Sequence, residues 1–302
     1  MVARHASPLE ALLVDERFDG EINPFEPMSR HTTYRIGGPA RYFARVHSVG
    51  ALARVLEACK AVGKKWYIVG RGSNLLVADE GVDAAVIVLG RDFRSMRYDE
   101  EKSRLMLGAG VPLSAAVQEA FRRSLAGLEF AVGTPGSVGG ALRMNAGSRD
   151  EWLGARVESV TSFSAEGGLV RRHGSEIEWG YRCSSFPADE ILVECELNME
   201  PADPFYIRGK MEASLKRRKA TQPLRQPSCG SVFKNPEGAS AGDLIERAVG
   251  GARISDVHAN FIVNTGNATA RDVLSLIELV QGKVLEAYGV ALKPEVKLLG
   301  FE

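Results

Sequence analysis

The sequence has few cysteines, and none of them lies in a metal-binding pattern. Its 302 residues include four cysteines, Cys59, Cys183, Cys195 and Cys229, with no C-x-x-C pair and no nearby histidine partner. Zinc sites and disulfide frameworks need such spacings, so we expect reduced thiols and no bound metal.

Net charge and long hydrophobic segments are also missing. Lys and Arg together number 38, as do Asp and Glu, so the formal net charge at pH 7 is zero. Such a chain has no global field to attract nucleic acid or an anionic membrane, and local groups must bind any anionic ligand. Apolar runs such as residues 84–89 are far shorter than the roughly 20 residues of a membrane span, and acidic residues interrupt the N-terminal segment. We therefore expect a cytoplasmic protein that binds neither nucleic acid nor membrane.

Familiar catalytic signatures are absent as well. The sequence has no G-x-S-x-G nucleophile elbow and no H-E-x-x-H pair, so acyl transfer and zinc hydrolysis have no support. The dinucleotide fingerprint G-x-G-x-x-G is incomplete, because the turn after residues 66–69 reads Gly70-Arg-Gly-Ser-Asn-Leu75.

Glycine, in contrast, is concentrated in residues 133–147, which read GTPGSVGGALRMNAG. This density is costly in backbone entropy, so it is tolerated chiefly where the chain needs positive φ or approaches a ligand closely. Free N–H groups of a tight turn form an anion-binding nest, and a helix that begins near Val138 would add its positive end. The stretch predicts a phosphate cradle, with a glycine-rich surface turn as the alternative.

Two further glycine-rich turns precede this stretch. Residues 70–74 follow a predicted strand and offer two glycines, a serine hydroxyl and an asparagine amide. Two nests of this kind can hold the two phosphates of a dinucleotide from opposite sides. The turn at residues 37–39 separates two predicted strands, and it is either an ordinary hairpin or a ligand contact.

Hydrophobic periodicity predicts alternating helices and strands up to residue 127, and then a β-rich region. A boundary is expected at residues 201–204, where the period-two pattern stops and a basic helix starts. The predicted helices cover residues 9–13, 48–63, 113–127, 205–220, 243–249 and 270–288. The predicted strands cover residues 66–69, 75–77, 84–89, 104–107, 157–164, 169–173, 191–199, 258–264 and 293–299.

Three polar residues stand in settings that surface decoration does not require. Arg182 lies in a polar loop bounded by aromatics, Ser231 follows a glycine in a proline-bounded loop, and Glu295 lies between Pro294 and an apolar strand. A guanidinium, a hydroxyl and a carboxyl are the groups that a flavin enzyme needs beside a polarised double bond. Cys229 is a rival nucleophile, although no histidine or acid near it in the sequence would activate it.

Six motifs in a fixed order resemble those of the UDP-N-acetylenolpyruvoylglucosamine reductase family, which acts in bacterial peptidoglycan precursor synthesis. They are residues 29–38 (SRHTTYRIGG), 70–77 (GRGSNLLV), 133–147, 181–186 (YRCSSF), 228–236 (SCGSVFKNP) and 294–296 (PEV). Only a few residues separate Phe186 from the strand at Ile191, so the chain resembles the short type without an inserted substrate-covering loop. Arg143 stands where an aromatic residue is common in the family, and residues 148–152 replace a common Tyr-Gly segment.

The resemblance implies an α+β protein with an FAD-binding fold of the vanillyl-alcohol-oxidase type, built from two α+β subdomains, and a smaller C-terminal α+β substrate domain. We expect an N-terminal extension over residues 1–28, an FAD-binding region over 29–200 that is split near 66, and a substrate-binding domain over 201–302. The implied cofactor is non-covalent FAD, with NADPH as co-substrate. The matching FAD contacts are Tyr34, Ile36, Gly70, Arg71, Gly72, Ser73, Asn74, Leu75, Gly133, Thr134, Pro135, Gly136, Ser137, Gly139, Gly140, Asn145, Ala146 and Gly147.

The resemblance also implies the reaction, which is reduction of UDP-N-acetylglucosamine enolpyruvate to UDP-N-acetylmuramate by a monomeric dehydrogenase. Ser231 matches the proton donor of the family, and Arg182 and Glu295 match the pair that stabilises the enolate. An enolate beside a carboxylate is dianionic, so a guanidinium and a protonated carboxyl lower its energy. The matching substrate contacts are Tyr181, Arg182, Gly230, Ser231, Asn235 and Glu295.

Two alternatives remain open from the sequence. One is a flavoprotein oxidase of the same fold that attaches FAD covalently, for which His31 lies near the first glycine turn. The other is a non-catalytic nucleotide-binding or scaffold protein. The Ser231 and Glu295 motifs argue against the first, and the presence of all three polar residues argues against the second.

Overall fold

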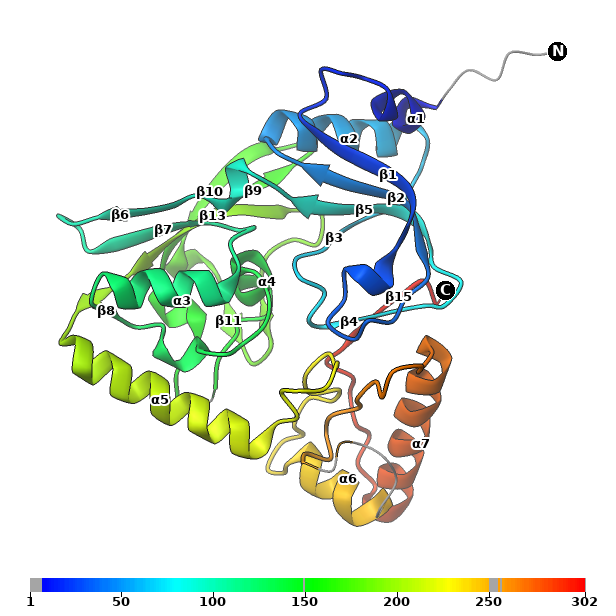
Figure 1. Cartoon of the computed structure of the whole chain (residues 1–302), viewed down its shortest axis with the longest axis vertical. Helices are drawn as coiled ribbons and strands as arrows, with labels where there is room; N and C mark the ends of the chain where they lie inside the picture. The colour runs from blue at the N-terminus through cyan, green and yellow to red at the C-terminus, as the bar shows by residue number, and fades with distance from the viewer. Residues whose placement is uncertain (1–6, 149, 250–254, 256, 302) are drawn as a thin grey trace. The chain divides into compact units, whose positions relative to one another are not determined.

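The computed structural model describes residues 7–148, 150–249, 255 and 257–301, and its chain divides into two compact units (Figure 1). Unit 1 comprises Met1–Glu26, Arg41–Gly70 and Asp83–Ser214, and unit 2 comprises Pro27–Ala40, Arg71–Val82 and Leu215–Glu302. Each unit has its own hydrophobic core. The domain boundaries expected at residues 28, 66 and 200 stay predictions.

The first sheet of unit 1 has the strand order β1-β2-β5-β3. Its strands are β1 (Gly20–Pro27), β2 (Pro39–Val46), β5 (Val82–Leu89) and β3 (Trp66–Ile68), and β3 pairs with β5 in parallel. Helix α1 (Pro8–Leu13) packs against α2 (Val49–Ala61), whose first turn is capped by the Ser48 hydroxyl, which accepts from the Ala51 amide. The predicted helix at 48–63 and the predicted strands at 66–69 and 84–89 are confirmed.

The second sheet of unit 1 is antiparallel throughout, with the order β10-β9-β13-β7-β6 (Figure 1). Its strands are β10 (Gly168–His173), β9 (Val157–Ser164), β13 (Ile191–Asn198), β7 (Arg104–Gly108) and β6 (Met96–Asp99). Along β13 buried residues alternate with more exposed ones from Val193 to Asn198, as the period-two pattern predicts.

Three helices accompany this sheet: α3 (Leu113–Arg122), α4 (Val138–Arg143) and α5 (Pro204–Thr221). Helix α3 ends five residues before the predicted end, because β8 (Leu125–Ala126) pairs with β14 (Glu200–Pro201). Short 3-10 turns of unit 1 are η2 (Asp92–Arg94), η3 (Glu129–Ala131), η4 (Leu153–Arg156) and η5 (Gly174–Glu176).

A small hairpin replaces the first part of the predicted polar loop at residues 181–186. Strand β11 (Trp179–Gly180) pairs with β12 (Cys183–Ser184), and Tyr181 and Arg182 form its two-residue tip. Arg182 has φ of +56°, a conformation that hairpin tips require and that glycine or asparagine usually supplies. The prediction of a polar loop is therefore wrong for Cys183 and Ser184, which belong to β12. The sequence does not signal this turn, because neither residue at the tip is a glycine.

Unit 2 contains η1 (Met28–Arg30), the parallel pair β4 (Leu75–Val77) and β15 (Lys297–Leu299), and helices α6 (Ala241–Val249) and α7 (Ala270–Tyr288). Helices α6 and α7 pack together. One face of α7 is buried through Val273, Ile277, Val280 and Val284. The Asp79 carboxylate accepts from the first two amides of α7, which stabilises the start of this predicted helix.

Two predicted strands of unit 2 are wrong. In the segment before Gly37, the Thr32 hydroxyl donates to the Ile36 carbonyl and the Arg35 amide donates to the Thr32 carbonyl, which makes a local turn. Residues 258–264 are irregular, because their asparagine side chains bond to the backbone of other segments in place of a strand partner. In both places a side chain satisfies backbone groups that a strand would have paired.

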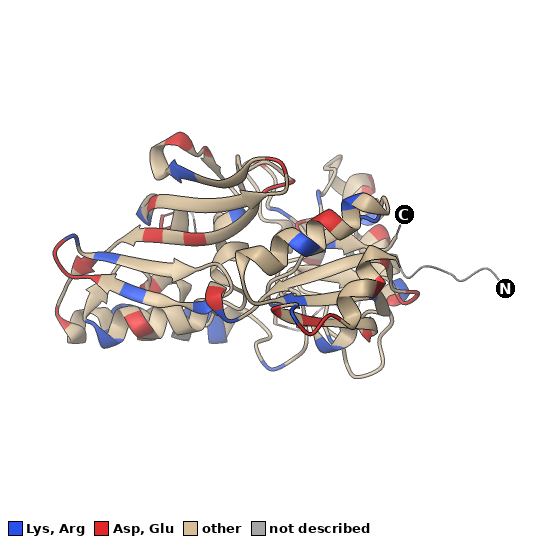
Figure 2. Cartoon of the chain, turned by 90° about the horizontal axis from the view of Figure 1, so that it is seen from above, with Lys and Arg blue, Asp and Glu red and all other residues tan. Residues whose placement is uncertain are grey.

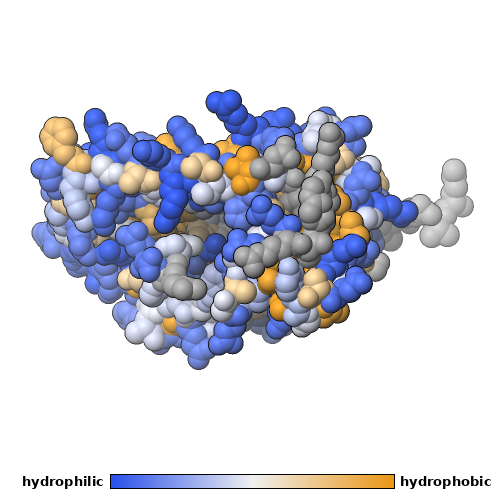
Figure 3. All heavy atoms as spheres, turned by 90° about the horizontal axis from the view of Figure 1, so that it is seen from below, coloured by the Kyte–Doolittle hydropathy of each residue, from blue (hydrophilic) through white to orange (hydrophobic). Residues whose placement is uncertain are grey.

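The surface mixes charges of both signs, as the composition predicts. Lys and Arg are interspersed with Asp and Glu along strands and helices (Figure 2). On the face drawn in Figure 3 hydrophilic side chains predominate, and hydrophobic ones form small separate groups. Within the described ranges, no helix has the length and apolar character of a membrane span.

Candidate active site

The predicted phosphate cradle lies in unit 1 as a turn that leads into α4. The Ser137 hydroxyl accepts from the Gly140 amide at 3.3 Å, while the Val138 and Gly139 amides donate to carbonyls of residues 111 and 109. The first amides of α4 are thus already bonded within the protein. Among the described residues, the Gly136 and Ser137 amides donate to no protein acceptor. These turn amides, rather than the helix end, are what an anion has available.

Gly70, the last residue of unit 1 before the second glycine turn, lies against this cradle. A Cβ on Gly70 would lie 2.3 Å from the Ser137 hydroxyl oxygen, so only glycine permits this approach. On the exposed side, a Cβ on Gly140 would meet only that same hydroxyl, at 3.4 Å. The turn therefore offers unbonded amides beside an exposed glycine, which fits the diphosphate of a dinucleotide such as FAD.

Replacement of Gly70 is a test of this contact. We expect Gly70→Ala to displace the Ser137 hydroxyl and to lower the free energy of unfolding by about 1 kcal/mol through the lost helix cap. It should also weaken retention of FAD. Gly209→Ala in α5 is the control, since no atom beyond its chain neighbours and its own helix backbone lies within 4 Å of its Cβ position. There alanine should stabilise by about 0.5–1 kcal/mol. Chemical denaturation and FAD release, measured on both variants, compare the two sites.

The segment after α4 is engaged by the hairpin that carries Arg182. Asn145 donates from Nδ2 to the Gly180 carbonyl at 3.1 Å, and its Oδ1 accepts from the Gly154 amide at 2.9 Å. Arg182 donates from Nη1 to the Gly147 carbonyl at 2.9 Å. The Asn145 side chain is thus held within the protein, and its backbone amide donates to the Leu142 carbonyl at 3.1 Å. Its contact with FAD stays a prediction. Within unit 1, the cradle segment and the hairpin are joined directly.

The remaining predicted cofactor residues belong to unit 2. The Tyr34 and Ile36 side chains are buried in its core, and their carbonyls accept from Asn264 and Thr32. Among the described residues, the Tyr34 and Ile36 amides donate to no protein acceptor, so they are available to a ligand. A Cβ on Gly72 would lie 2.1 Å from the His31 carbonyl oxygen, so the turn at residues 70–74 needs glycine there.

This turn of unit 2 contacts one of the predicted catalytic residues. Asn74 donates from Nδ2 to the Glu295 carbonyl at 3.1 Å, and its own carbonyl accepts from the Lys297 amide at 3.0 Å. Ser73 and Leu75 flank Asn74, and Leu75 begins β4, which pairs with β15. The structure thus places the predicted cofactor turn beside the strand that follows Glu295.

Ser231 and Glu295 lie on segments that pair with each other. The Glu295 amide donates to the Val232 carbonyl at 2.7 Å, and Phe233 forms an antiparallel bridge with Pro294. Both side chains are half-buried. Gly230 before Ser231 has φ of +82°, a left-handed conformation that favours glycine. Within unit 2 the predicted proton donor and the predicted carboxyl are therefore neighbours, while Arg182 belongs to unit 1 and its meeting with them stays a prediction.

Asn235 and Tyr181, the other predicted substrate contacts, have exposed side chains. The Asn235 Oδ1 accepts from the Ala241 amide at 3.0 Å and so holds the start of α6. The Arg182 guanidinium lies 5.4 Å from the centre of the Tyr181 ring, within the range of a cation–π contact.

Sequence reasoning missed Asn260, which holds the segment after Ser231. Its Oδ1 accepts from the Phe233 amide at 2.9 Å, its Nδ2 donates to the Phe233 carbonyl at 2.8 Å, and its carbonyl accepts from the Val232 amide at 2.9 Å. The side chain is 4% exposed. Its only signal in the sequence is a polar residue inside the apolar run 259–263.

Cys229 is unsuited to the nucleophilic role that the sequence left open. The thiol is 3% exposed, and burial raises its pKa to about 12. A raised pKa keeps the thiol protonated near neutral pH, where the thiolate is the reactive form. We expect iodoacetamide to alkylate exposed Cys183 of the native protein first and to leave Cys229 unmodified, as peptide mass spectrometry would report. Rapid labelling of Cys229 would contradict this assignment.

Across the ranges that the structure describes, no group of three or more His, Cys, Asp or Glu side chains could hold a metal ion. The predicted site residues supply a hydroxyl and a carboxyl in unit 2 and a guanidinium in unit 1, with amides from the glycine turns. This set can bind anions and move a proton.

Comparisons with known proteins cover nearly the whole chain. Residues 222–299 match the UDP-N-acetylenolpyruvoylglucosamine reductase C-terminal domain, and residues 40–172 match an FAD binding domain. The UDP-N-acetylenolpyruvoylglucosamine reductase of Heliobacterium modesticaldum is 44% identical over 94% of this chain and 92% of its own length. The enzyme of that name from Synechococcus sp. (strain WH7803) is 42% identical over 94% of each chain.

Solved structures agree with these relatives. The crystal structure of UDP-N-acetylenolpyruvylglucosamine reductase from Thermus caldophilus matches with a TM-score of 0.80 and 36% identity, over 93% of this chain and 99% of that one. Phl p 4.0202, a glucose dehydrogenase, matches 65% of this chain and 44% of its own, with a TM-score of 0.50 and 15% identity, and so shares the fold alone.

These findings confirm three predictions from the sequence. The fold is α+β with an FAD-binding domain of the vanillyl-alcohol-oxidase type, the cofactor is FAD, and the protein is an oxidoreductase. Proteins with other activities share only the fold, whereas the reductases match from end to end. The chain belongs to the UDP-N-acetylenolpyruvoylglucosamine reductase family.

Proposed function

We propose that the protein reduces UDP-N-acetylglucosamine enolpyruvate to UDP-N-acetylmuramate, with NADPH as the electron donor and FAD as the carrier. The observation that carries this proposal is the pairing of the Ser231 and Glu295 segments in unit 2, with Asn74 of the glycine turn bonded to Glu295. A hydroxyl and a carboxyl beside a cofactor turn are the groups that protonation of an enolate requires.

In this reaction one hydride and one proton add across the carbon–carbon double bond, and NADPH becomes NADP⁺. Bound FAD, once NADPH has reduced it, would supply the hydride. The Ser231 hydroxyl donates the proton to the carbon beside the carboxylate. Arg182 and the protonated Glu295 stabilise the negative charge that develops on that carboxylate and enolate. The unbonded amides of Gly136 and Ser137 are assigned to the diphosphate of the cofactor.

An absorbance experiment without oxygen tests cofactor, reductant and substrate together. The purified protein is followed after addition of NADPH and then of the enolpyruvyl nucleotide. We expect yellow protein that bleaches with NADPH and recovers its colour only with that nucleotide. A protein that bleaches with NADPH but is not reoxidised by the nucleotide would contradict the proposed substrate. A protein that is reduced by NADH but not by NADPH would contradict NADPH as the electron donor.

Replacement of Arg182 separates its role from a structural one. Arg182→Lys keeps the charge but loses the planar two-point contact of the guanidinium with a carboxylate. We expect the rate of flavin reoxidation by the nucleotide to fall about 10-fold or more, as the loss of one charge-assisted hydrogen bond predicts, with flavin reduction unchanged. Rapid-mixing absorbance measures both steps, and Arg97→Lys on the surface of the same unit is the control. Equal losses in both steps would indicate a structural role for Arg182.

A further inference from the structure

The hairpin with Arg182 at its tip is attached to the cradle segment at several points. Besides the bonds of Asn145 and Gly147, the Ser184 hydroxyl donates to the Arg143 carbonyl at 3.0 Å, and α4 packs against β12. These contacts hold the two strands of the hairpin. Separate contacts hold the chain that leaves β12. That chain is the segment 185–190, which connects the hairpin to β13.

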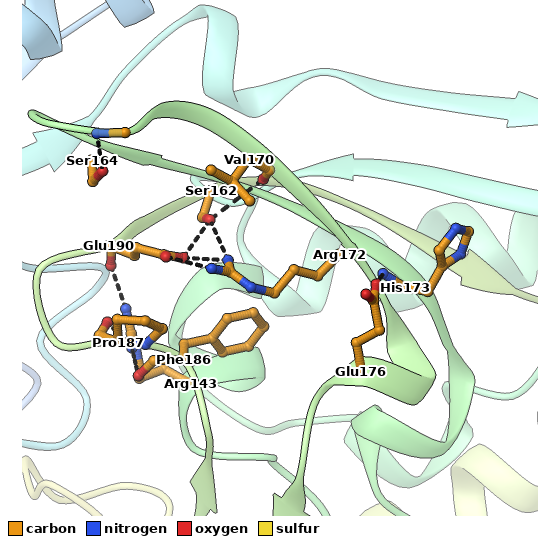
Figure 4. Close-up of polar contacts among 11 residues, drawn as sticks. Arg143, Ser162, Ser164, Val170, Arg172, His173, Glu176, Phe186, Pro187 and Glu190 are labelled. Carbon is orange, nitrogen blue, oxygen red and sulfur yellow. Dashed lines mark hydrogen bonds and ion pairs between the residues drawn. The ribbon is translucent and has the colours of Figure 1, made fainter.

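The Arg143 side chain holds this connecting segment by its backbone. Nη1 donates to the Phe186 carbonyl and to the Pro187 carbonyl, each at 2.9 Å, and Nη2 donates to the Glu190 carbonyl (Figure 4). The guanidinium carbon also lies 5.5 Å from the centre of the Phe186 ring. One side chain from the last residue of α4 therefore binds three carbonyls across five residues.

The far end of the segment is held by a separate set of contacts. Arg172 donates to both carboxylate oxygens of Glu190, at 2.5 and 2.6 Å, and the Ser162 hydroxyl donates to Glu190 Oε2 at 2.6 Å (Figure 4). Glu190 is buried, so this ion pair fixes the entry to β13 on the sheet. The segment is thus clamped to the sheet at Glu190 and to α4 through Arg143.

The Arg143 guanidinium is well suited to bind several backbone carbonyls at once. Burial lowers its pKa, but arginine stays protonated in proteins, so it remains a cation with five N–H donors. Its planar fork reaches several carbonyls at once, which the single ammonium of lysine does not do. Since Nη1 and Nη2 are occupied by carbonyls of residues 186, 187 and 190, the side chain faces this segment.

The hairpin tip needs such support, because Arg182 itself is in the left-handed region, with φ of +56°. Non-glycine residues persist there only when the surrounding structure over-determines their conformation. Contacts on both sides of the tip supply that constraint. They come from the same segment, residues 143–147, that follows the predicted phosphate cradle.

We propose that Arg143 is a positioning residue, which fixes the Arg182 hairpin relative to the cofactor segment by clamping residues 186–190. The inference rests on the proposed function, in which Arg182 stabilises the enolate. Arg143 itself touches neither cofactor nor substrate in this assignment. It acts on catalysis only through the geometry of Arg182.

The test uses the full-length, FAD-loaded protein and the variants Arg143→Gln, Arg143→Lys and Arg97→Gln. Arg97 is the matched control, because it is a surface arginine of the same unit that pairs with Glu194 at 2.7 Å. Hydrogen exchange of the peptide over residues 183–190 and the two flavin half-reactions are measured for each. We expect Arg143→Gln to speed exchange in that peptide and to slow flavin reoxidation about 10- to 100-fold, as a displaced catalytic group does.

In Arg143→Gln, flavin reduction by NADPH and the flavin spectrum should stay as in the unaltered protein. The exchange and reoxidation rates of Arg143→Lys should lie between those of Arg143→Gln and those of the unaltered protein. Unchanged exchange or reoxidation in Arg143→Gln would overturn the inference. If Arg143→Gln does not retain FAD, the same measurements are made on Arg143→Lys and Ser184→Ala. In both we expect faster exchange and slower reoxidation, with smaller changes than for Arg143→Gln. Failure of the proposed function is seen separately, because the unaltered protein would then not be reoxidised by the nucleotide at all.

Discussion

Ser231→Ala is expected to abolish most turnover while flavin reduction by NADPH proceeds at its normal rate. The hydroxyl is assigned to protonate the carbon beside the carboxylate, and general acid catalysis of this kind contributes about 10²–10⁴-fold. The loss should therefore appear in reoxidation of the reduced flavin by the enolpyruvyl nucleotide. Rapid mixing of pre-reduced protein with that nucleotide measures the step directly.

Two further observations sharpen this test. In deuterated solvent, the residual reaction of Ser231→Ala should lose stereochemical control of deuterium entry, because water then reaches the enolate from either face. Ser240→Ala is the control: its hydroxyl accepts from the Asp243 amide at 3.3 Å and lies outside the candidate set. Near-normal reoxidation by Ser231→Ala would end the assignment of Ser231 as proton donor.

Asn260→Ala is expected to cause the largest loss of stability. It would leave the amide and the carbonyl of buried Phe233 without their partners at 2.9 and 2.8 Å. Each of the two unsatisfied buried groups costs about 1–3 kcal/mol, so the free energy of unfolding should fall by roughly 2–6 kcal/mol. Chemical denaturation followed by circular dichroism measures this change.

The same variant should also affect catalysis, because Val232 and Phe233 connect Ser231 to the Glu295 segment. Asn260→Asp keeps the acceptor for the Phe233 amide but loses the donor to the Phe233 carbonyl and buries a carboxylate beside it, so its destabilisation should be at least as large. Asn198→Ala is the control, since this exposed asparagine donates to Glu158 at 3.0 Å and exposed sites usually change stability by no more than about 0.5 kcal/mol. A loss for Asn260→Ala as small as that of the control would contradict the assignment of Asn260 as the residue that holds the segment after Ser231.

Much of the fold could be predicted from local patterns. The helix over residues 48–63 was predicted from apolar spacing and a serine cap, and the structure has that helix with that cap. The period-two pattern over residues 191–199 likewise becomes β13 in the centre of the second sheet. Such elements are predictable because spacing within one segment decides which face is buried.

The failures share a physical cause. Residues 258–264 look like a strand in the sequence, but Asn260 and Asn264 use their side chains to bond the backbone of distant segments. Arg182 occupies a hairpin tip without the usual glycine, because bonds from residues 143–147 hold the hairpin. Partners that lie far away in the sequence override local preference in both places.

The sequence by itself determined the family, through six motifs of glycines and polar residues in a fixed order. It also determined the candidate residues Arg182, Ser231 and Glu295, since each stands in a motif. Only the tertiary structure decided how they are held. It pairs the Ser231 and Glu295 segments, bonds Asn260 to the segment after Ser231, and turns the Arg143 guanidinium toward residues 186–190. These contacts join segments far apart in the chain, and their energies depend on burial and geometry that no local pattern encodes.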